Sequence, residues 1–489
     1  MALSDAQFTA WLASASSIRT VLVEVVARIV STETTLYLSN RNYFTGSADT
    51  PASTAYQACI AGGVSTSEAL NLDGSPSMSW GDIEIANADG SRDGWLDYVW
   101  ANRAVNVYVG DPTWPRADFR LVFSGVVDDI ASRARDVLNL RLRDKLERLN
   151  APVSEATLGG STDNKDRLTP LVFGEVHNVE PLLVNPATLI YQYHTGAAER
   201  LIEVRDNGVP VSTTSVLSTG KFKLLATPAG QVTASVQGRT PYSNTVSGIV
   251  QALATGYGTP SERLTSGDLG SAQLAAFAVA CPQPVGYYLG DRANVLQVCQ
   301  ELAASVGAQV VMSREGKLRI VRLALPGTGS PVAIGPQDYE ARSLTIKERT
   351  TVIAGVKLGY CKNWTVQTNL DTGIPPEHKD LYAQEWLTVT ASDPAVASAY
   401  KLYAEPEQIN TLLLREADTQ AEADRRLSLW KVQRTVYQVK GFAQCLLLEL
   451  GQAVTLQGDR FGLQSGKTGT VIGLQLDWMA GRATVEVLI

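Results

Sequence analysis

Short runs of β-branched and aromatic residues are the feature that most constrains how this chain can fold. In the first third of the chain they recur at intervals of roughly ten residues, and turns containing Gly, Asp or Asn separate them. The first two runs, joined by the turn STET, predict a β-hairpin. The spacing of the whole series predicts a barrel or a sandwich. The clearest runs are IRTVLVEVVARIV (18–30), TTLYLS (34–39), AVNVYVG (104–110), FRLVFSGVV (119–127) and VLNLRLRD (137–144).

The middle of the chain changes from an alternating to a helical period. SNTVSGIVQALATGYG (243–258) and SAQLAAFAVA (271–280) predict helices. Before them, RLIEVRDNGVPV, GKFKLLATPAG and QVTASVQG predict a small β unit with D-N-G and P-A-G turns. Further on, READTQAEADRRLSLWKV (415–432) predicts one helix within a second β-rich region.

A helix followed by a hairpin is expected at residues 292–323. The apolar residues Val295, Val298, Leu302 and Val306 recur at three- and four-residue spacing, which predicts an amphipathic helix ending at Gly307. The next residues, VVMSREGKLRIVRL, predict a hairpin on the turn Arg314-Glu315-Gly316 that packs on the helix.

The last strands repeat the pattern of the first domain. AVNVYVGD, SGVV and VLNLRLRD can be set beside AVTLQGDR (453–460), TGTVIGL (468–474) and ATVEVLI (483–489). Both sets contain a strand, a Gly-containing strand and an alternating strand, in that order. The match predicts an internal duplication.

Composition excludes several classes of protein. The length of 489 residues suggests about three domains, and 45% hydrophobic residues suffice for a sizeable core. A net charge of −7 argues against a sequence-reading DNA-binding protein. The sequence has no run of eighteen apolar residues and its first residues lack a signal-peptide pattern, so we expect synthesis in a cytoplasm.

Cysteine and histidine spacing predicts neither a disulfide framework nor a metal site. No C-x-x-C or H-E-x-x-H pattern occurs. We expect buried free thiols, and histidines in surface or turn positions. The residues concerned are Cys59, Cys281, Cys299, Cys361, Cys445, His177, His194 and His378.

Three further motifs resemble sites but are better explained as turns or strands. SGKT (465–468) lacks a glycine five residues before Gly466, and the β-rich TVIGLQL follows it, so a hairpin loop is favoured over a phosphate cradle. The calcium-loop reading of 87–95 would place Trp100 where a bidentate Glu is needed, which favours a polar turn. Asp128 and Asp129 are neighbours in a predicted strand, so their side chains point to opposite faces and favour solvated positions. We predict no catalytic residue, no cofactor and no metal site.

Several segments, taken in order, resemble the baseplate hub or tail-tip hub proteins of tailed bacteriophages and gene-transfer particles. The resemblance runs from about residue 20 to the end and rests on the order of loosely defined motifs. They are YLSNRNYFT, GDIEIANADGSRDGWLDYVWANRAVNVYVGD, FSGVVDDIASRARDVLNLRLRDKLERLNAPV, LTPLVFGEVHNVEPLLVN, ANVLQVCQELAASVGAQVVMSREGKLRIVRL and VYQVKGFAQCLLLELGQAVTLQGDRFGL.

The resemblance implies a mainly β, α+β multidomain fold with two tail-tube-like β-barrel domains flanking a middle region. On this reading 1–160 is the first tube-like domain, 161–240 a small β domain, 241–340 a helical and helix-hairpin domain, and 341–489 a second tube-like domain with one helix. The middle region then holds the small β unit and the helix-plus-hairpin unit.

The resemblance also implies a virion structural protein: a homotrimeric ring at the tail tip that closes the tail tube. Its implied partners are a distal tail or tail tube protein, the tape-measure protein and a central fibre or spike. DNA would pass through the lumen without specific binding during ejection. Three copies carry three times −7, or about −21, and an acidic lumen would repel phosphates.

Two other functions stay open from the sequence. Some hubs carry a wall-degrading domain, but no extra segment stands outside the hub-like order here, so we expect no enzyme. The alternative is a tail-associated peptidoglycan-degrading enzyme that uses one cysteine and one histidine. A receptor- or carbohydrate-binding tail protein is the other, with part of the nine Trp and seventeen Tyr forming a platform.

Overall fold

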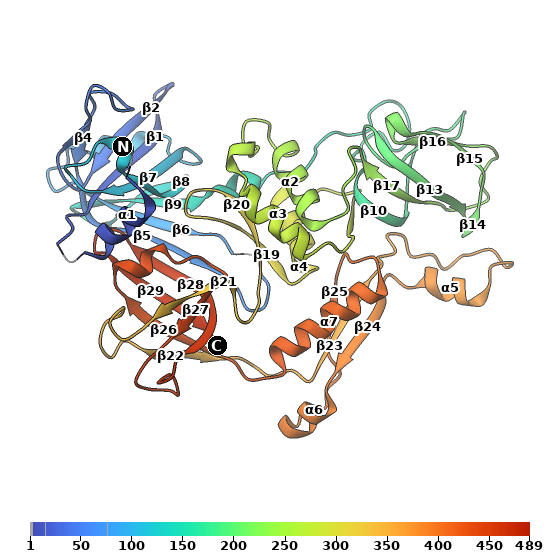
Figure 1. Ribbon diagram of the computed structural model, residues 1–489. Coiled ribbons are helices and arrows are strands. Elements are labelled where there is room, and N and C mark those ends of the chain that lie inside the picture. The colour runs from blue at the N-terminus through green and yellow to red at the C-terminus, as the bar shows by residue number, and fades with distance from the viewer. Residues whose placement is uncertain (1–2, 15, 76) are drawn as a thin grey trace. The chain divides into compact units, whose positions relative to one another are not determined.

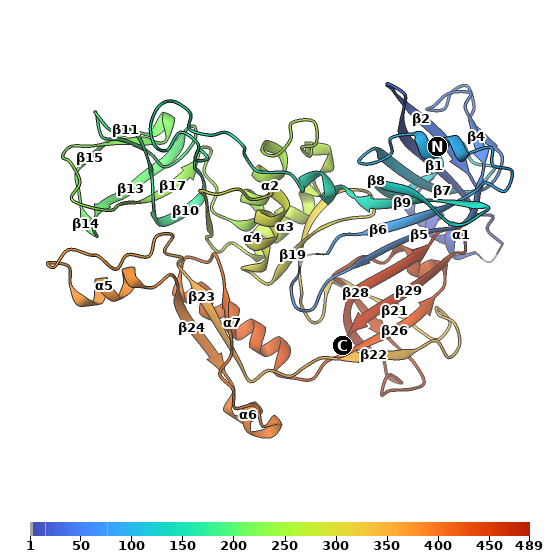
Figure 2. The same cartoon turned by 180° about the vertical axis from the view of Figure 1, so that it is seen from behind.

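The computed structural model describes residues 3–14, 16–75 and 77–489, which form two compact units (Figures 1 and 2). The first unit comprises Met1–Arg148, Val311–Thr351 and Gln433–Ile489, and the second comprises Leu149–Val310 and Val352–Val432. The expectation of a mainly β, multidomain chain is confirmed. None of the helices within the described ranges combines the length and the apolar composition that a membrane crossing needs.

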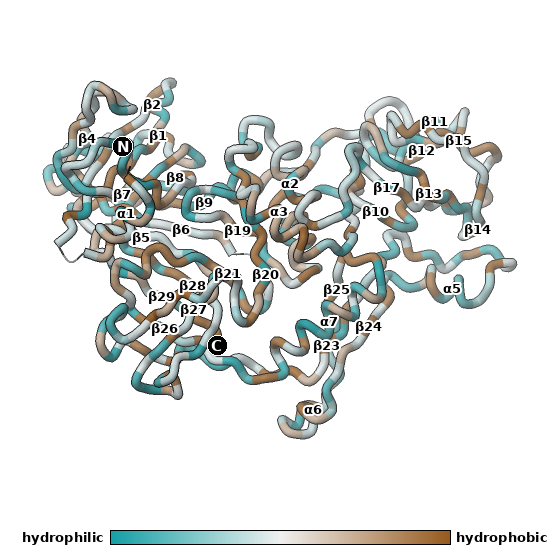
Figure 3. Tube along the Cα trace, in the orientation of Figure 1, coloured by the Kyte–Doolittle hydropathy of each residue, from teal (hydrophilic) through white to brown (hydrophobic). Residues whose placement is uncertain are grey.

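The first unit is built almost entirely from strands. In Figure 3 hydrophobic colours appear along parts of its strands, among them β28 and β29, and many connecting loops are hydrophilic. Its elements are α1 (Asp5–Ala13), β1 (Thr20–Ile29), β2 (Thr32–Ser39), β3 (Tyr43–Phe44), β4 (Ala55–Ala58), β5 (Ile60–Ala69), β6 (Trp80–Ala86), β7 (Ala104–Gly110), β8 (Arg120–Ala134), β9 (Val137–Asp144), β20 (Leu318–Arg322), β21 (Thr328–Ile334), β22 (Thr345–Arg349), β26 (Thr435–Gly441), β27 (Gln452–Leu456), β28 (Lys467–Asp477) and β29 (Arg482–Leu488).

The second unit combines small sheets with helices. A five-stranded sheet has the order β14-β13-β17-β10-β18, and α7 packs on the three-stranded sheet β24-β23-β25. Its elements are β10 (Leu171–Val179), β11 (Leu182–Asn185), β12 (Ile190–Gln192), β13 (Ala198–Asp206), β14 (Val209–Pro210), β15 (Thr213–Val216), β16 (Lys221–Leu224), β17 (Val232–Arg239), α2 (Val246–Gly256), α3 (Ser271–Ala280), β18 (Gly286–Leu289), α4 (Val295–Ala304), β23 (Gly355–Tyr360), α5 (Pro376–Ala383), β24 (Leu387–Ser392), α6 (Pro394–Tyr400), β25 (Gln408–Asn410) and α7 (Glu416–Trp430).

Most of the local predictions are confirmed. β1 and β2 form the expected hairpin, with Ile29 opposite Thr32. Helix α4 is followed by Gly307 in the left-handed conformation, and β19 (Ala308–Met312) pairs with β20 around the predicted turn at Gly316. Helices α5 and α6 were not predicted.

Residues Val352–Val432 belong to the second unit. The second tube-like region, expected at 341–489 with one helix, is therefore interrupted by this insertion. The insertion holds α5, α6 and α7. The predicted helix of 415–432 corresponds to α7, which packs on β23 and β24 within the insertion. The four-part division of the chain otherwise stays a prediction.

The first unit contains the same arrangement of six strands twice. Along the sheet, β5-β6-β9-β8-β7-β1 in the first repeat matches β22-β26-β29-β28-β27-β21 in the second. Each strand also occupies the same place in chain order in its repeat. A short 3-10 helix follows β6 in the first repeat, at Asp93–Asp97, and β26 in the second, at Ala443–Leu447. The two differ at one end: β1 pairs antiparallel with β7, whereas β21 pairs parallel with β27.

The register of the strands repeats as well. Ala104 of β7 lies opposite Val126 of β8, and Ala453 of β27 lies opposite Thr470 of β28. The register of β8 against β9 shifts after Val127, which is two residues beyond Gly125. The register of β28 against β29 shifts after Val471, which is two residues beyond Gly469. A β-bulge thus sits at the same place in both long strands. The predicted internal duplication is confirmed by the shared strand order and by the register around the repeated glycine.

The repeated glycine of these strands allows a close backbone approach. A Cβ atom on Gly125 would lie 2.2 Å from the carbonyl oxygen of Arg143, and one on Gly469 would lie 2.3 Å from that of Leu488. Real Cβ atoms do not come this close to a carbonyl oxygen, so both positions require glycine for lack of space. This explains why a Gly-containing strand occurs in both repeats.

The two repeats join into one open sheet instead of closing into two barrels. After its bulge, β28 leaves β27 and pairs antiparallel with β5 of the first repeat, from Gly473 opposite Ala69 to Asp477 opposite Ser65. The edge of β5 that could close a first barrel is therefore occupied by the second repeat. No pairing among residues 3–14, 16–75 and 77–489 closes either repeat, which corrects the expectation of barrels.

The loop at Arg314 ties both repeats to one core. Its carbonyl oxygen accepts from the backbone N–H of Ser124 in the first repeat, at 2.7 Å. Its guanidinium donates to the carbonyl oxygens of Leu446 and Leu448 in the second, at 2.8 and 2.9 Å. One hydrophobic core includes buried residues of both repeats, among them the fully buried Trp478.

A buried carboxyl lies at the seam between the repeats. Glu68 of β5 is 8% exposed, pairs in register with Leu474 of β28, and lies near the guanidinium groups of Arg314 and Arg319. Burial, only partly offset by these cations, raises the pKa of Glu68 to about 7. Burial likewise raises the pKa of Asp144 to about 6.

Replacing either repeated glycine should destabilise the sheet. Gly125→Ala and Gly469→Ala should each lower the free energy of unfolding by about 1–3 kcal/mol, because the new methyl group overlaps a partner carbonyl. Gly94→Ala is the control, since a Cβ there meets no atom within 4 Å. Urea denaturation measures all three, and equal stabilities for Gly125→Ala and Gly94→Ala would contradict the close-approach explanation.

Stability should fall as pH rises through the range in which Glu68 ionises. Its folded pKa of about 7 lies above the ordinary value of 4.5, so the unfolded chain ionises first and gains up to about 3 kcal/mol relative to the folded chain. The loss begins near pH 4.5 and is complete above pH 7. Glu68→Gln should remove most of it in urea titrations at pH 5 and 8, while Glu348→Gln at an exposed position should not. A wild-type stability that rises over this interval would refute the assignment.

Candidate functional site

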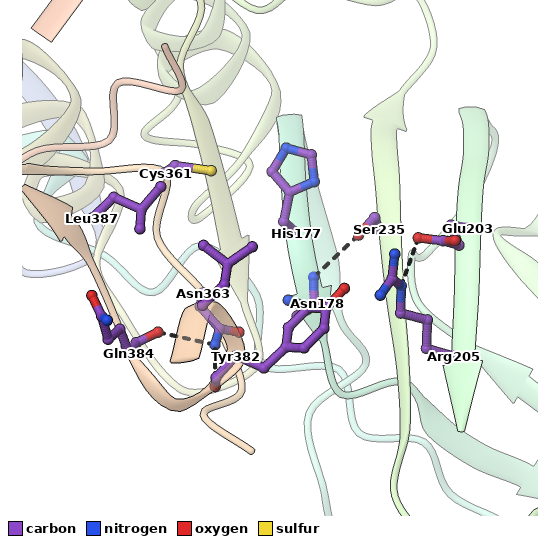
Figure 4. Close-up of a pocket in the computed structure, with 11 residues that line it drawn as sticks. His177, Asn178, Glu203, Arg205, Ser235, Cys361, Asn363, Tyr382, Gln384 and Leu387 are labelled. Carbon is purple, nitrogen blue, oxygen red and sulfur yellow. Dashed lines mark hydrogen bonds and ion pairs between the residues drawn. The ribbon is translucent and has the colours of Figure 1, made fainter. Parts of the chain in front are cut away.

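The second unit contains a small pocket of about 210 Å³ (Figure 4). Strand β10 supplies His177 and Asn178 to its wall, and the segment after β23 supplies Cys361 and Asn363. The remaining lining residues are Glu203, Arg205, Ser235, Leu381, Tyr382, Gln384 and Leu387. The fold thus brings together one cysteine and one histidine that are far apart in sequence.

The side chain of Asn363 holds this wall in place. It is 7% exposed, and its amide donates to the carbonyl oxygens of Tyr382 and Gln384 at 2.9 and 3.1 Å. Its own carbonyl oxygen accepts from the N–H of Thr365. Every polar atom of this amide is therefore used in fixing backbone, which makes Asn363 a structural anchor.

Cys361 and His177 do not form a nucleophile–base pair. A reactive thiol needs a lowered pKa, but burial and then the charge of Glu175 raise the pKa of Cys361. The Nε2 atom of His177 lies 3.3 Å from Oε1 of Glu175, and this hydrogen bond lowers the pKa of that carboxyl. Among the described residues, no hydrogen bond joins the Cys361 thiol to the imidazole. The pocket therefore offers no activated nucleophile.

The other histidines occupy different environments. His378 is exposed on α5, as expected for a surface residue. His194 is only 1% exposed, which corrects its expected surface position. Its Nδ1 atom accepts from the N–H of Val172 at 2.9 Å, and burial lowers its pKa to about 4. It is a neutral hydrogen-bond acceptor within the core.

The remaining candidates are placed in turns and strands. The SGKT segment leads from β27 into β28, and the two strands pair antiparallel, so the hairpin interpretation is confirmed. Asp89 accepts from Ser91, and Asp93 accepts from Asn87, which closes a polar turn. In the described ranges, no group of three His, Cys, Asp or Glu side chains has the geometry of a metal site.

Asp128 and Asp129 lie at the bulge of β8 and make separate contacts. Asp128 forms an ion pair with Arg143 at 2.9 Å, and Asp129 accepts from the N–H of Ile130. They are not a pair of catalytic carboxylates. All five cysteines are free thiols; four are buried, and Cys361 is half-buried.

A second cavity, of about 440 Å³, has an aromatic wall within the same unit. Tyr287, Tyr288 and Trp364 line it, with Lys362 lying over the Trp364 ring at 4.1 Å. Its lining holds three basic and three acidic side chains, so it has no net charge. This cavity is where the carbohydrate-binding alternative would place a glycan. The sequence pattern does not indicate that these aromatic residues are neighbours.

Solved structures resemble the chain along most of its length. The 43 kDa tail protein of prophage MuSo2 from Shewanella oneidensis aligns over 96% of this chain and 98% of its own, at 11% identity and a TM-score of 0.41. A tail protein from Neisseria meningitidis MC58 aligns over 96% of both chains, at 11% identity and a TM-score of 0.38. A chain of the virion of a native gene transfer agent particle aligns over 70% of this chain and 90% of its own, at 13% identity and a TM-score of 0.40. No protein-family model and no curated protein matches the chain.

Alkylation of Cys361 should be slow at neutral pH. Because burial and Glu175 raise its pKa, the rate of reaction with iodoacetamide should reach its midpoint above pH 8.5, the ordinary value for a thiol. Peptide mapping by mass spectrometry measures the rate, and the same cysteine in the urea-unfolded chain is the control. A midpoint at or below pH 7 would reveal an activated thiol and revive the enzyme hypothesis.

Proposed function

We propose that this chain is the structural hub of a phage-type tail, a protein that closes the end of the tail tube. In this proposal three copies form a ring at the tail tip. The ring contacts a distal tail or tail tube protein on one side and a central fibre or spike on the other. It surrounds the end of the tape-measure protein before DNA passes through.

The duplicated six-strand arrangement is the observation that carries this proposal. Two equivalent repeats, joined through β5 and β28, give each chain two similar building blocks side by side in one sheet. Three such chains supply six building blocks, which is the number needed to match a six-fold tube to a three-fold tip. The hub-like order of the sequence motifs supports the same assignment.

The proposed role is structural and does not include catalysis. The pocket that brings Cys361 and His177 together has a thiol with a raised pKa and an asparagine occupied by backbone. The net charge of −7 suits a protein past which DNA must slide. We place the protein in the virion, at the tail tip.

The location of the chain in particles tests this proposal. Particles from the source culture, labelled with an antibody against this chain and viewed by electron microscopy, should carry label only at the tail tip. The matched control is an antibody against a major tail tube protein, which should label along the tail. Absence of this chain from all particles, or label along the tail, would refute the hub assignment.

A further inference from the structure

The strand pairing that joins the two repeats has an equivalent that the single chain does not form. Within the chain, the first-repeat strand β5 adds to the part of β28 that follows its bulge. The strand equivalent to β5 is β22, and the strand equivalent to β28 is β8. If β22 and β8 pair in the same way as β5 and β28, β22 adds to the part of β8 that follows the bulge.

Both strands have a free edge at the required place. β22 ends the sheet, so only its edge toward β26 is paired. β8 pairs with β7 only up to Val126, and Val127 still bonds to Arg103. From Asp129 onward, only the side of β8 that faces β9 has a strand partner among the described residues. An unpaired edge of this kind is a template for another strand.

Equivalent residues differ in burial in the way a missing partner predicts. Through their pairings with β6 and β26, Thr66 of β5 corresponds to Ile346 of β22. Thr66 is 6% exposed, whereas Ile346 is 41% exposed even though it is the more apolar residue. All residues of β22 are exposed. In β5 the corresponding edge is covered by β28, and an added strand would cover this edge of β22 in the same way.

We propose that β22 of one copy pairs antiparallel with residues 129–133 of β8 in a second copy. This inference rests on the proposed hub function and gives the ring its contact. Transferring the register of β5 and β28, with the bulge of β22, places Glu348 opposite Ala131 of the partner copy. Ser132 and Arg133 come next, within a second register shift of β8 that β28 lacks, and the guanidinium of Arg133 pairs with Asp82 of its own chain at 2.7 Å.

The contact is head-to-tail, a type that closes into a ring when its rotation divides a full turn. Each copy offers the end strand β22 and the part of β8 that β7 leaves uncovered, and neither strand contacts its own counterpart. The sheet of one chain would continue into the next through the same joint that already connects its two repeats. The partner is thus a second copy of this chain.

Cysteine pairs at the predicted register test the contact. Particles carrying the double variant Ala131→Cys with Glu348→Cys should give disulfide-linked dimers and trimers on a non-reducing gel, because opposed strand positions bring Cβ atoms within reach of a disulfide. Mixing chains that carry only Ala131→Cys with chains that carry only Glu348→Cys should give dimers and nothing larger. The control pair, Ala131→Cys with Thr328→Cys on the exposed strand β21, should stay monomeric.

A second measurement uses the unmodified chain. Zero-length carbodiimide cross-linking of wild-type particles should join Lys347 to Asp129 of the neighbouring copy in peptides from the dimer band. The cross-link of Lys347 to Glu486 of its own chain, its ion-pair partner at 2.7 Å, is the internal control. Particles with this chain at the tail tip that give the control cross-link but not the one to Asp129 would overturn the strand contact and leave the hub function standing. If the chain is absent from particles, the proposed hub function itself is refuted. Cross-linking of purified chains then tests the strand contact independently of that function.

Discussion

The pairing of β5 with β28 is the interaction on which the rest of the first unit depends. It occurs because β28 divides one edge between two partners, β27 before its bulge and β5 after it. The bulge follows Gly469, whose missing side chain allows β28 to lie against the carbonyl of Leu488. Without this joint the two repeats would each have an open edge, and the single core around Trp478 would be split.

The joint also constrains function. It fixes the two equivalent repeats in one sheet, and the loop at Arg314 holds them through hydrogen bonds to both. In the proposed ring each chain would be one segment, extended at β22 and at the uncovered part of β8 by its neighbouring copies. The pocket of the second unit, with its raised thiol pKa and its occupied asparagine, adds no sign of catalysis.

Sequence reasoning succeeded where the signal is local. Strand alternation, the turn at Gly316, the helix end at Gly307 and the repeated Gly-containing strand all depend on residues close in sequence. It failed where distant residues meet. The strand spacing and the hub resemblance predicted barrels, whereas β5 pairs with β28 from the other end of the chain. The burial of His194 and the meeting of Cys361 with His177 likewise arise from packing between distant strands.

A three-dimensional reconstruction of the tail tip by cryo-electron microscopy tests the central claim most directly. The account predicts three copies of this chain in one closed ring, with the two repeats alternating around the lumen and a continuous sheet crossing from β22 of each copy to β8 of the next. A tip in which this chain forms no ring would contradict it, as would a ring in which only one of the repeats faces the lumen.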